Sequence, residues 1–328
     1  MAAGPERRVR AVFLGSGPFG LPTLERLAGR RDVELVAVVT APPRPAGRHR
    51  RPSPTPIGAW AAAHGLAVLA PPRLRSPDAL AAVLALGPEL AVLADYGQIV
   101  PPPLLELPFG ALNLHPSLLP RHRGAAPVAA AILAGDRQTG VTLFRMDAGL
   151  DTGPIVARRV VPIAPDDTAA TLEARLALVA ADLLDDVLAA WLRGEMAAEP
   201  QPSAGATLTR PLRRDDGRLD PFRPAAELER QVRAFQPWPG AFLETATGRL
   251  IVHAARVEPS EPDDEPGRLV ASGDGLALAT PAGRLRLERV QPAGGRVMSG
   301  AEYRRGRPRL VGTTVPASRP EPAVPDGF

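Results

Sequence analysis

Residues 110–120 read Gly-Ala-Leu-Asn-Leu-His-Pro-Ser-Leu-Leu-Pro, and this stretch decides how the first half of the chain folds. The apolar run from Gly110 to Leu114 predicts a β-strand. Residues two apart on an extended chain point to the same side, so Asn113 and His115 can face one cleft. An amide and an imidazole together at a strand end make a candidate reaction site.

A second motif, Met-Asp-Ala-Gly-Leu-Asp-Thr-Gly at 146–153, follows about thirty residues later. It supplies a carboxylate, Asp151, in a glycine-flanked turn. Asn, His and Asp together can hold an oxyanion, move a proton and set the charge of the imidazole. Taken singly, His115 is more often a structural histidine and Asp151 a turn residue. The three residues therefore indicate a reaction site only when they are taken together.

Strand-like and helix-like patterns alternate through the first half of the chain, which predicts a mostly parallel α/β sheet. Ligands of such sheets bind beyond the carboxyl ends of the strands, where Asn113 and His115 lie. We expect strands at 9–14, 34–39, 90–94, 111–114, 140–145 and 154–161, and helices at 22–27, 77–86, 102–107 and 168–192.

The turn Gly15-x-Gly17-x-x-Gly20 matches the dinucleotide-binding pattern in a strand–turn–helix context. The acidic residue expected at the end of the second strand is missing, because Thr40 and Ala41 stand there. Arg44 could meet a 2′-phosphate, so an NADP oxidoreductase stays an alternative. We favour a tight turn whose backbone N–H groups approach a carboxylate or phosphate.

Composition bounds the classes of function. The 328 residues have room for two domains. Cysteine is absent, which excludes disulfides, a thiolate nucleophile and Cys-based metal sites. All 39 basic residues are arginines, so lysine chemistry is excluded, and the net charge is +4. The chain has no apolar run long enough for a bilayer and no signal peptide pattern, so we expect a cytoplasmic protein with no membrane partner.

The second half of the chain has a different texture. A Pro- and Ala-containing connector precedes a short helix at 225–235. Several short strand-like runs with Gly/Pro turns then predict a small antiparallel β-barrel, and the Pro-rich end predicts a disordered tail. The expected strands are 241–245, 250–257, 267–271, 276–280 and 285–290.

Arginines gather in two places. The segment 41–56 is predicted to be a loop that carries four of them without an acid, and 296–309 carries five against one acid, Glu302. A solvated surface is the plain interpretation, and a phosphate-binding surface is the functional one. The arginines are Arg44, Arg48, Arg50 and Arg51 in the first set, and Arg296, Arg304, Arg305, Arg307 and Arg309 in the second.

These motifs resemble those of the folate-dependent formyltransferases, whose active-site pattern is Asn-x-His after a strand and a later Asp-x-Gly. Residues 117–127, Ser-Leu-Leu-Pro-Arg-His-Arg-Gly-Ala-Ala-Pro, resemble the branch that acts on methionyl-tRNA. The resemblance runs from about Val9 to Gly312. It implies a Rossmann-like first domain at 1–194, a linker at 195–211, an OB-like tRNA-binding domain at 212–314 and a tail at 315–328.

The resemblance also implies the reaction, in which a formyl group passes from 10-formyltetrahydrofolate to the α-amino group of initiator methionyl-tRNA without a metal. The Asn113 amide and a protonated His115 would stabilise the oxyanion, and Asp151 would keep His115 charged. We expect the two arginine sets to bind tRNA, and the protein to be a monomer. The residues implied at the folate are Tyr96, Gly97, Gln98, Ser117, Leu118, Leu119, Pro120, Asp147 and Gly149.

Two residues depart from the family pattern. Asp95 stands where a small residue is usual, and His122 where Trp is common. The alternatives are a formyltransferase acting on a sugar-nucleotide amine or on glycinamide ribonucleotide, an RNA-binding module with a vestigial enzyme domain, and the NADP oxidoreductase. The basic loop speaks against the first of these, and the complete Asn113, His115 and Asp151 set against the others.

Overall fold

The computed structural model describes residues 7–46 and 51–317. The chain forms two compact units. The first comprises Met1–Ala131, Arg137–Ala164 and Thr171–Pro211; the second comprises Ile132–Asp136, Pro165–Ala170 and Leu212–Phe328.

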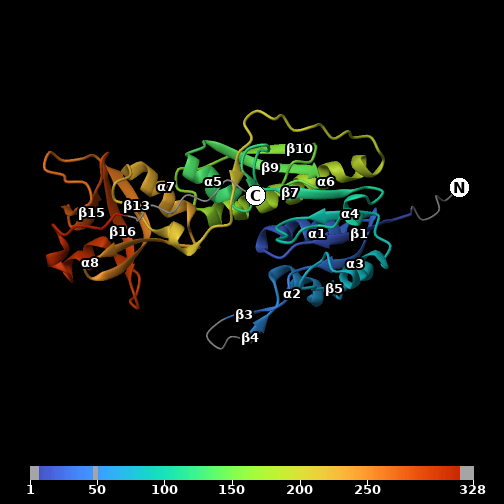
Figure 1. Cartoon of the computed structure of the whole chain (residues 1–328), viewed down its shortest axis with the longest axis horizontal. Coiled ribbons are helices and arrows are strands. Elements are labelled where there is room, and N and C mark those ends of the chain that lie inside the picture. The colour runs from blue at the N-terminus through green and yellow to red at the C-terminus, as the bar shows by residue number, and fades with distance from the viewer. Residues whose placement is uncertain (1–6, 47–50, 318–328) are drawn as a thin grey trace. The chain divides into compact units, whose positions relative to one another are not determined.

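The first unit is built on a seven-stranded sheet with the order β10-β9-β7-β6-β1-β2-β5 (Figure 1). Five of its strands run parallel, while β9 and β10 are antiparallel to their neighbours. Strand β6 and the last four residues of β1, Ala11 to Leu14, are apolar and buried on both faces, as a covered parallel sheet requires. The strands are β1 Val9–Leu14, β2 Val33–Val39, β5 Val68–Leu69, β6 Leu90–Leu93, β7 Ala111–His115, β9 Gln138–Arg145 and β10 Ile155–Pro162.

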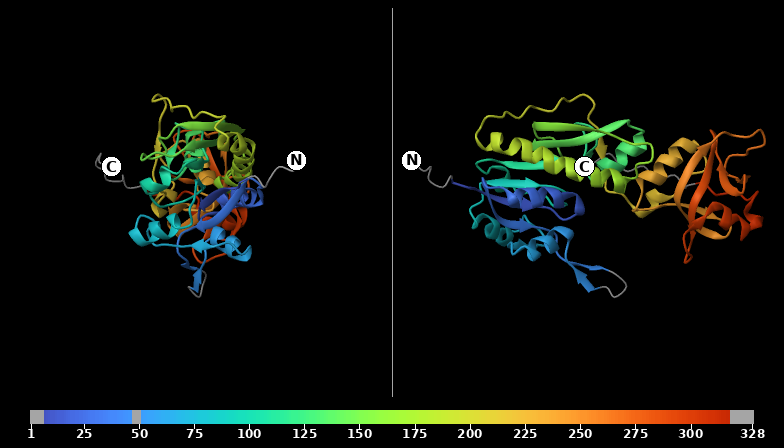
Figure 2. Two further views of the ribbon diagram at one scale, coloured as in Figure 1. Left: turned by 90° about the vertical axis from the view of Figure 1, so that its right-hand side faces the viewer. Right: turned by 180° about the vertical axis from the view of Figure 1, so that it is seen from behind.

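Helices pack along this sheet, and the longest of them, α6, runs beside it in the right-hand view of Figure 2. The predicted helix at 168–192 is thereby confirmed, with a buried face that includes Leu172, Leu176 and Leu183. The helices of this part of the chain are α1 Leu21–Gly29, α2 Pro56–Ala63, α3 Pro77–Leu84, α4 Pro102–Leu105, α5 Pro127–Ala134 and α6 Ala169–Leu192, with a 3₁₀ turn at Pro18–Gly20.

The carboxyl ends of β7, β6 and β1 lie next to one another, because these strands are neighbours and parallel. His115 ends β7, Asp95 follows β6, and Gly15 follows β1. After β1 the chain continues to β2 on one side, and it later returns to β6 on the other. The strand order therefore reverses between β1 and β6. The carboxyl ends of these two neighbouring strands form the topological switch point, where α/β sheets hold their ligands.

The second unit is an antiparallel sheet with the order β12-β13-β16-β15-β14, to which β17 adds at β16. All five strands that the sequence predicted here are found. Their apolar residues share one core with α7 and with Tyr303 of α8. The elements are η2 Arg214–Gly217, α7 Ala225–Ala234, β12 Ala241–Thr245, β13 Gly248–Glu258, β14 Leu269–Ser272, β15 Gly275–Ala279, β16 Arg284–Pro292, β17 Met298–Ser299, α8 Gly300–Arg305 and η3 Pro308–Leu310.

The predicted fold class is thus confirmed: a mostly parallel α/β sheet is followed by a separate antiparallel, strand-rich unit. The division at 194, 211 and 314 stays a prediction. Val315, placed at the start of the expected tail, is 1% exposed, and its backbone N–H donates to the Gly267 carbonyl. Residues 318–328, most of that tail, lie outside the described residues.

Two segments expected to be irregular have regular structure. The basic segment 41–56 contains an antiparallel pair, β3 Arg44–Ala46 and β4 Arg51–Ser53, so the expectation of a plain loop was wrong. The expected linker forms a short strand, β11 Leu208–Thr209, which pairs in parallel with β8 Arg123–Gly124. In the described ranges, 7–46 and 51–317, no helix has the length and apolar character to cross a membrane.

Candidate active site

Asn113 and His115 lie on β7, as the sequence predicted. Strand β7 is held between β6 and β9, where Asn113 pairs with Leu93 and Phe144, and His115 pairs with Thr142. His115 is 5% exposed, whereas Asn113 is half-buried. Among the residues that the structure describes, none hydrogen-bonds the Asn113 side chain. That amide is therefore available to a ligand at the strand ends.

The structure brings Asp151 to His115, with Oδ2 at 3.7 Å from Nδ1. This separation is too long for a hydrogen bond and short enough for a strong electrostatic interaction. The same Oδ2 accepts a 2.7 Å hydrogen bond from the Gly124 backbone N–H. The other ring nitrogen, Nε2, lies 2.9 Å from the His122 carbonyl oxygen. A carbonyl can only accept, so Nε2 carries a proton and a neutral His115 has its lone pair on Nδ1.

Burial lowers the pKa of His115 below its usual value, and this outweighs the nearby charge of Asp151 and the hydrogen bond to His122, which raise it. The direction of this shift opposes the expectation that Asp151 keeps His115 protonated at rest, and that expectation stays a prediction. A lowered pKa favours the neutral imidazole, and in that form Nδ1 is the nitrogen that can accept a proton. Asp151 then stabilises the imidazolium once it forms, rather than maintaining it.

The Asp151 turn is held by its own residues. Oδ1 of Asp147 accepts the Gly149 N–H at 3.0 Å and the Thr152 hydroxyl at 2.7 Å, in the manner of an Asx-turn. A Cβ at Gly153 would lie 1.9 Å from the Arg145 carbonyl, so only glycine fits there. The carboxylate of Asp147 thus supports the turn from within.

Three non-glycine residues of the described ranges have positive φ angles, and all lie at this site: Asp95 (55°), His122 (58°) and Asp151 (51°). Such backbone conformations cost free energy, and they persist where the surroundings impose them, often at functional sites. At His122 the conformation aims the backbone carbonyl at His115. At Asp151 it accompanies the approach of the carboxylate to the imidazole.

The loop after β7 is fixed mainly from inside. Thr142 of β9 donates its hydroxyl to the Ser117 carbonyl at 2.7 Å and accepts the Leu119 N–H at 3.1 Å. Ser117 is fully buried and Leu119 is 1% exposed, while Leu118 is half-buried and packs near Gly140. Pro120, which follows a cis peptide bond, is also buried. These predicted folate residues therefore shape the loop, and Leu118 has the most accessible side chain among them.

Tyr96, Gly97 and Gln98 follow β6 at the same edge. Gln98 binds the segment below it: its Oε1 accepts the Leu74 N–H at 2.7 Å, and its Nε2 donates to the Pro71 carbonyl at 3.1 Å. Burial raises the pKa of Tyr96 to about 12, and its hydroxyl has no hydrogen-bond partner among the described residues. Gly97 is exposed.

Asp95 lies over the glycine-rich turn. A Cβ at Gly17 would fall 1.6 Å from Asp95 Oδ2, and Cβ atoms at Gly15 and Gly20 would come within 2.7 and 2.9 Å of the Ala94 carbonyl. The three glycines therefore let the end of β6 approach the turn. Asp95 is an exposed residue, but its carboxyl group sits in this crowded place, and burial raises its pKa. The carboxylate that approaches the turn is the protein's own, which disfavours a dinucleotide diphosphate here.

The predicted arginines differ in their surroundings. Arg44 is exposed on β3 and Arg51 begins β4, whereas Arg48 and Arg50 lie outside the described residues. In the second unit Arg304 donates to the Gly273 and Gly275 carbonyls at 2.7 and 3.0 Å, which makes it a support of that turn.

The rest of the second set is more open. Arg307 lies over the Tyr303 ring at 4.6 Å, and Arg296 lies 3.7 Å from Glu302. Arg305 and Arg309 are exposed.

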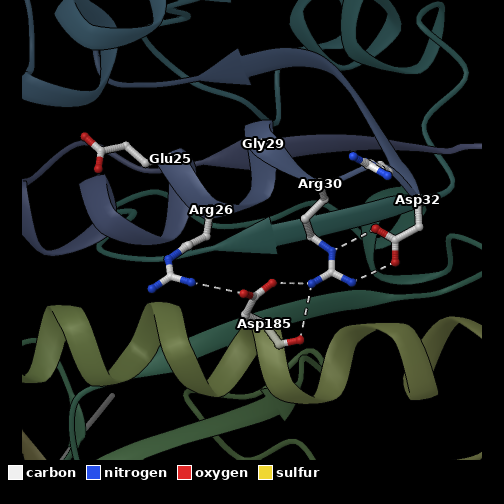
Figure 3. Close-up of a pocket in the computed structure, with 7 residues that line it drawn as sticks. Glu25, Arg26, Gly29, Arg30, Asp32 and Asp185 are labelled. Carbon is white, nitrogen blue, oxygen red and sulfur yellow. Dashed lines mark hydrogen bonds and ion pairs between the residues drawn. The ribbon is translucent and has the colours of Figure 1, made fainter.

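A separate charged pocket of about 510 Å³ lies between α1 and α6 (Figure 3). Arg30 stands between Asp32 and Asp185, and Arg26 also donates to Asp185. Asp32 immediately precedes β2, so this pocket is at the opposite edge of the sheet from Asn113 and His115. Arg26 and Arg30 pair with Asp32 and Asp185 in this pocket, which is the pattern of a structural ion-pair network. Within the described ranges, no cluster of side chains suited to a metal ion is found.

Comparison with known proteins adds the family. The Formyl transferase family matches residues 9–188, and its C-terminal domain family matches residues 211–308. The chain belongs to the formyl transferase family. The resemblance inferred from the motifs is thereby confirmed.

Among its relatives, methionyl-tRNA formyltransferase of Halorhodospira halophila is 47% identical over 308 residues, covering 93% of this chain and 99% of the relative. The protein of the same name from Roseiflexus castenholzii is 45% identical over 306 residues, covering 93% and 97%.

Solved structures share the fold at lower identity. An N-formyltransferase from Helicobacter canadensis in complex with folinic acid and dTDP-3-aminofucose has a TM-score of 0.62 at 15% identity, over 85% of this chain and 98% of that one. HypX from Aquifex aeolicus in complex with tetrahydrofolic acid has a TM-score of 0.59 at 17% identity, over 91% of this chain and 47% of that one. At these identities the likeness concerns the fold alone.

Some residues at the site belong to no motif that points to their contacts. Gly124 was visible only as part of the 117–127 motif, yet its amide binds Asp151. Thr142 looked like one more residue of a β-strand. Gln201 and Thr207 lay in a segment that composition assigned to a linker, and both contact residues of the site.

Proposed function

We propose that this protein transfers the formyl group of 10-formyltetrahydrofolate to the α-amino group of initiator methionyl-tRNA. The observation that carries the proposal is the grouping of Asn113, His115 and Asp151 at the carboxyl edge of the sheet. Family membership supports formyl transfer as the chemistry, and the relatives named methionyl-tRNA formyltransferase support this acceptor.

The proposed mechanism begins with attack of the neutral amine on the formyl carbon. An aminoacyl amine loses its proton near pH 7–8, roughly as a terminal amine does, so it needs little activation. A new N–C bond forms and the formyl oxygen becomes an oxyanion. The Asn113 amide, which no described residue engages, is suited to donate to that oxyanion.

His115 is suited to move the proton. Its Nδ1 accepts the amine proton, directly or through water, because Nε2 is already committed to the His122 carbonyl. Asp151, at 3.7 Å, stabilises the imidazolium as it forms. The intermediate then collapses: the bond from the formyl carbon to the folate nitrogen breaks, and the leaving nitrogen takes the proton from His115. His115 has then given up the proton that it accepted, so the site returns to its starting state. The proposed mechanism uses no metal.

Formylfolate is a substrate of this reaction, and we propose that it lies beyond the ends of β6 and β7. Three features support this position: the free Asn113 amide, the exposed Gly97 backbone and the partly exposed turn at 147–152. Gln98 and Asp147 act mainly as supports of the walls, through the hydrogen bonds described above. Leu118 supplies an apolar surface to the proposed folate position.

We propose that the exposed arginines bind the tRNA phosphates, Arg44 from the β3–β4 hairpin and Arg305 and Arg309 from the second unit. Arg pairs with phosphates through two parallel hydrogen bonds, which suits this role. We also propose that the protein acts in the cytoplasm as a monomer.

The test is formylation of charged initiator tRNA, read by mass analysis of the released aminoacyl group. The expected product is formylmethionine, formed only with 10-formyltetrahydrofolate. A sugar-nucleotide amine and glycinamide ribonucleotide serve as competing acceptors, and turnover of either in place of the tRNA would refute the proposed acceptor. Thermal shifts with a folate and with NADPH separate the enzyme classes, because a specific ligand stabilises the folded protein.

A further inference from the structure

The segment between α6 and α7, drawn in yellow, runs back along β10 and β9 (Figures 1 and 2). We call residues 199–209 of this segment the brace. It begins with an antiparallel bridge between Glu199 and Ile155, which has backbone hydrogen bonds of 2.7 and 2.8 Å. It ends in β11, which pairs with β8. The brace belongs to the first unit, which extends to Pro211.

Gln201 of the brace holds the Asp151 turn. Its side-chain Nε2 donates to the carbonyls of Asp151 and Gly153, at 2.8 and 2.7 Å. Its Oε1 in turn accepts two hydrogen bonds from the Arg123 guanidinium, at 3.1 and 2.6 Å. The Gln201 side chain therefore links the backbone of Asp151 and Gly153 to the side chain of Arg123, which precedes Gly124.

Thr207 of the brace holds the other partner of the imidazole. Its hydroxyl oxygen accepts the His122 N–H at 2.8 Å, and the His122 carbonyl accepts His115 Nε2. Backbone bonds of Thr207 to Pro120 and Arg123 fix this part of the brace independently of the side chain.

The brace also determines the residue type at position 124. Gly124 has φ +105°, and a Cβ there would lie 2.2 Å from the Thr209 carbonyl oxygen. The close approach of Thr209 thus keeps the Gly124 amide where it donates to Asp151.

We infer that Gln201 and Thr207 are positioning residues of the active site, which set the distance between Asp151 and His115 and the direction of the imidazole. This inference rests on the proposed function for its meaning in catalysis. Gln201 is half-buried and Thr207 is exposed, so neither adds much to an apolar core. Their contacts are directional hydrogen bonds to the two strained residues, His122 and Asp151.

The test compares Gln201→Met, which keeps the side-chain length but neither donates nor accepts strongly, with the wild type. The matched control is Ser203→Ala, an exposed position of the brace whose hydroxyl hydrogen-bonds no residue within 7–46 and 51–317. A loss of alignment of about 1 Å typically costs on the order of 100-fold in rate, so we expect kcat to fall roughly 10- to 100-fold in Gln201→Met. The KM of Gln201→Met for the formyl donor should change less than about two-fold. The kcat of Ser203→Ala should also stay within about two-fold of the wild type.

A second readout does not depend on turnover. The His115 imidazole is titrated by NMR in each protein. Burial, the Asp151 carboxylate and His122 act on this ring. If Asp151 is no longer held at 3.7 Å, its charge supports the imidazolium less, and the pKa of His115 falls below its wild-type value. A role in folding alone would lower the melting temperature and leave this pKa unchanged.

Thr207→Val is the second variant, and it keeps the test sharp if Gln201→Met folds poorly. It preserves shape and backbone bonds but removes the acceptor for the His122 N–H. We expect a lower kcat and an altered His115 titration here also. Folded variants that match Ser203→Ala in both kcat and the His115 pKa would overturn the inference.

The wild-type acceptor assay separates this outcome from failure of the proposed function. If another amine proves to be the acceptor, the kcat comparison is made with that amine. If the wild type formylates no acceptor, the His115 titration alone decides.

Discussion

Replacing Gly124 by alanine should damage both stability and turnover, and Gly205→Ala provides a matched control. Both glycines have positive φ, +105° and +79°. A methyl group at Gly205 would meet nothing within 4 Å, whereas at Gly124 it would lie 2.2 Å from the Thr209 carbonyl. Both substitutions therefore place an L-residue at a positive φ angle, which costs free energy. Only the alanine at position 124 also collides with the Thr209 carbonyl.

The shared penalty of an L-residue in this conformation is about 1–2 kcal/mol. In Gly124→Ala the collision is with backbone, so it is relieved only by separating β8 from β11. That movement withdraws the amide from Asp151, and a hydrogen bond to a charged group is worth about 1.5–3 kcal/mol. We expect Gly124→Ala to be less stable than Gly205→Ala by about 2–3 kcal/mol, or about 4–12 °C in melting temperature for a unit of this size.

The assay is thermal unfolding of both variants, together with single-turnover formylation at a temperature where both are folded. A displaced Asp151 should lower the turnover of Gly124→Ala by roughly 100-fold, with Gly205→Ala near the wild type. Equal melting temperatures for the two variants would refute the steric argument. Normal turnover in a destabilised Gly124→Ala would refute the link from Gly124 to Asp151.

Further outcomes follow from other parts of the structure. Asn113→Ala should lower kcat by about 10²–10³ without loss of folding, as expected for one oxyanion donor, and unchanged kcat would remove it from the mechanism. Burial, and then the charge of Asp95, raise the pKa of Glu173, so its ionisation destabilises the folded state as pH rises. Glu173→Gln should consequently melt higher than the wild type at pH 8 and equally at pH 4; the opposite pH trend would contradict the assignment. Arg305→Ser should weaken tRNA binding and flatten its salt dependence, whereas Arg304→Ser should mainly lower the melting temperature, which a filter-binding and melting comparison would check.

Much of the fold could be predicted because the pattern is strong where burial is complete. Strand β6 is a continuous apolar run, and β1 is apolar and buried from Ala11 to Leu14. The second unit alternates short strands with Gly/Pro turns. Helix α2 was missed because its apolar residues, Ile57 to Ala63, lack a clear periodicity. Its start was nevertheless marked, since the Thr55 hydroxyl accepts the Gly58 N–H at 2.9 Å and Pro56 stands at the first helical position.

The candidate site was predictable in its residues but not in its charge state. Spacing alone placed Asn113 and His115 on one side of a strand. The depth at which His115 is buried depends on packing from β6 and β9, and so its lowered pKa could not be read from the motif. The contacts of Gln201 join residues about fifty positions apart, and a Pro- and Ala-containing segment offers no periodicity that would reveal them.

The brace also limits how this chain can be recombined with others. The end of α6 at Leu192 is one place at which the C-terminal part of the chain could be exchanged with that of a relative. With a junction at Leu192, the relative's chain would supply the residues at the positions of Gln201, Thr207 and Thr209, while this chain supplies the rest of the reaction site. A chimera joined at Pro211 retains all three, and a truncated first unit needs the same end point. The residues that must be kept together with the reaction site therefore extend to Pro211, the last residue of the first unit.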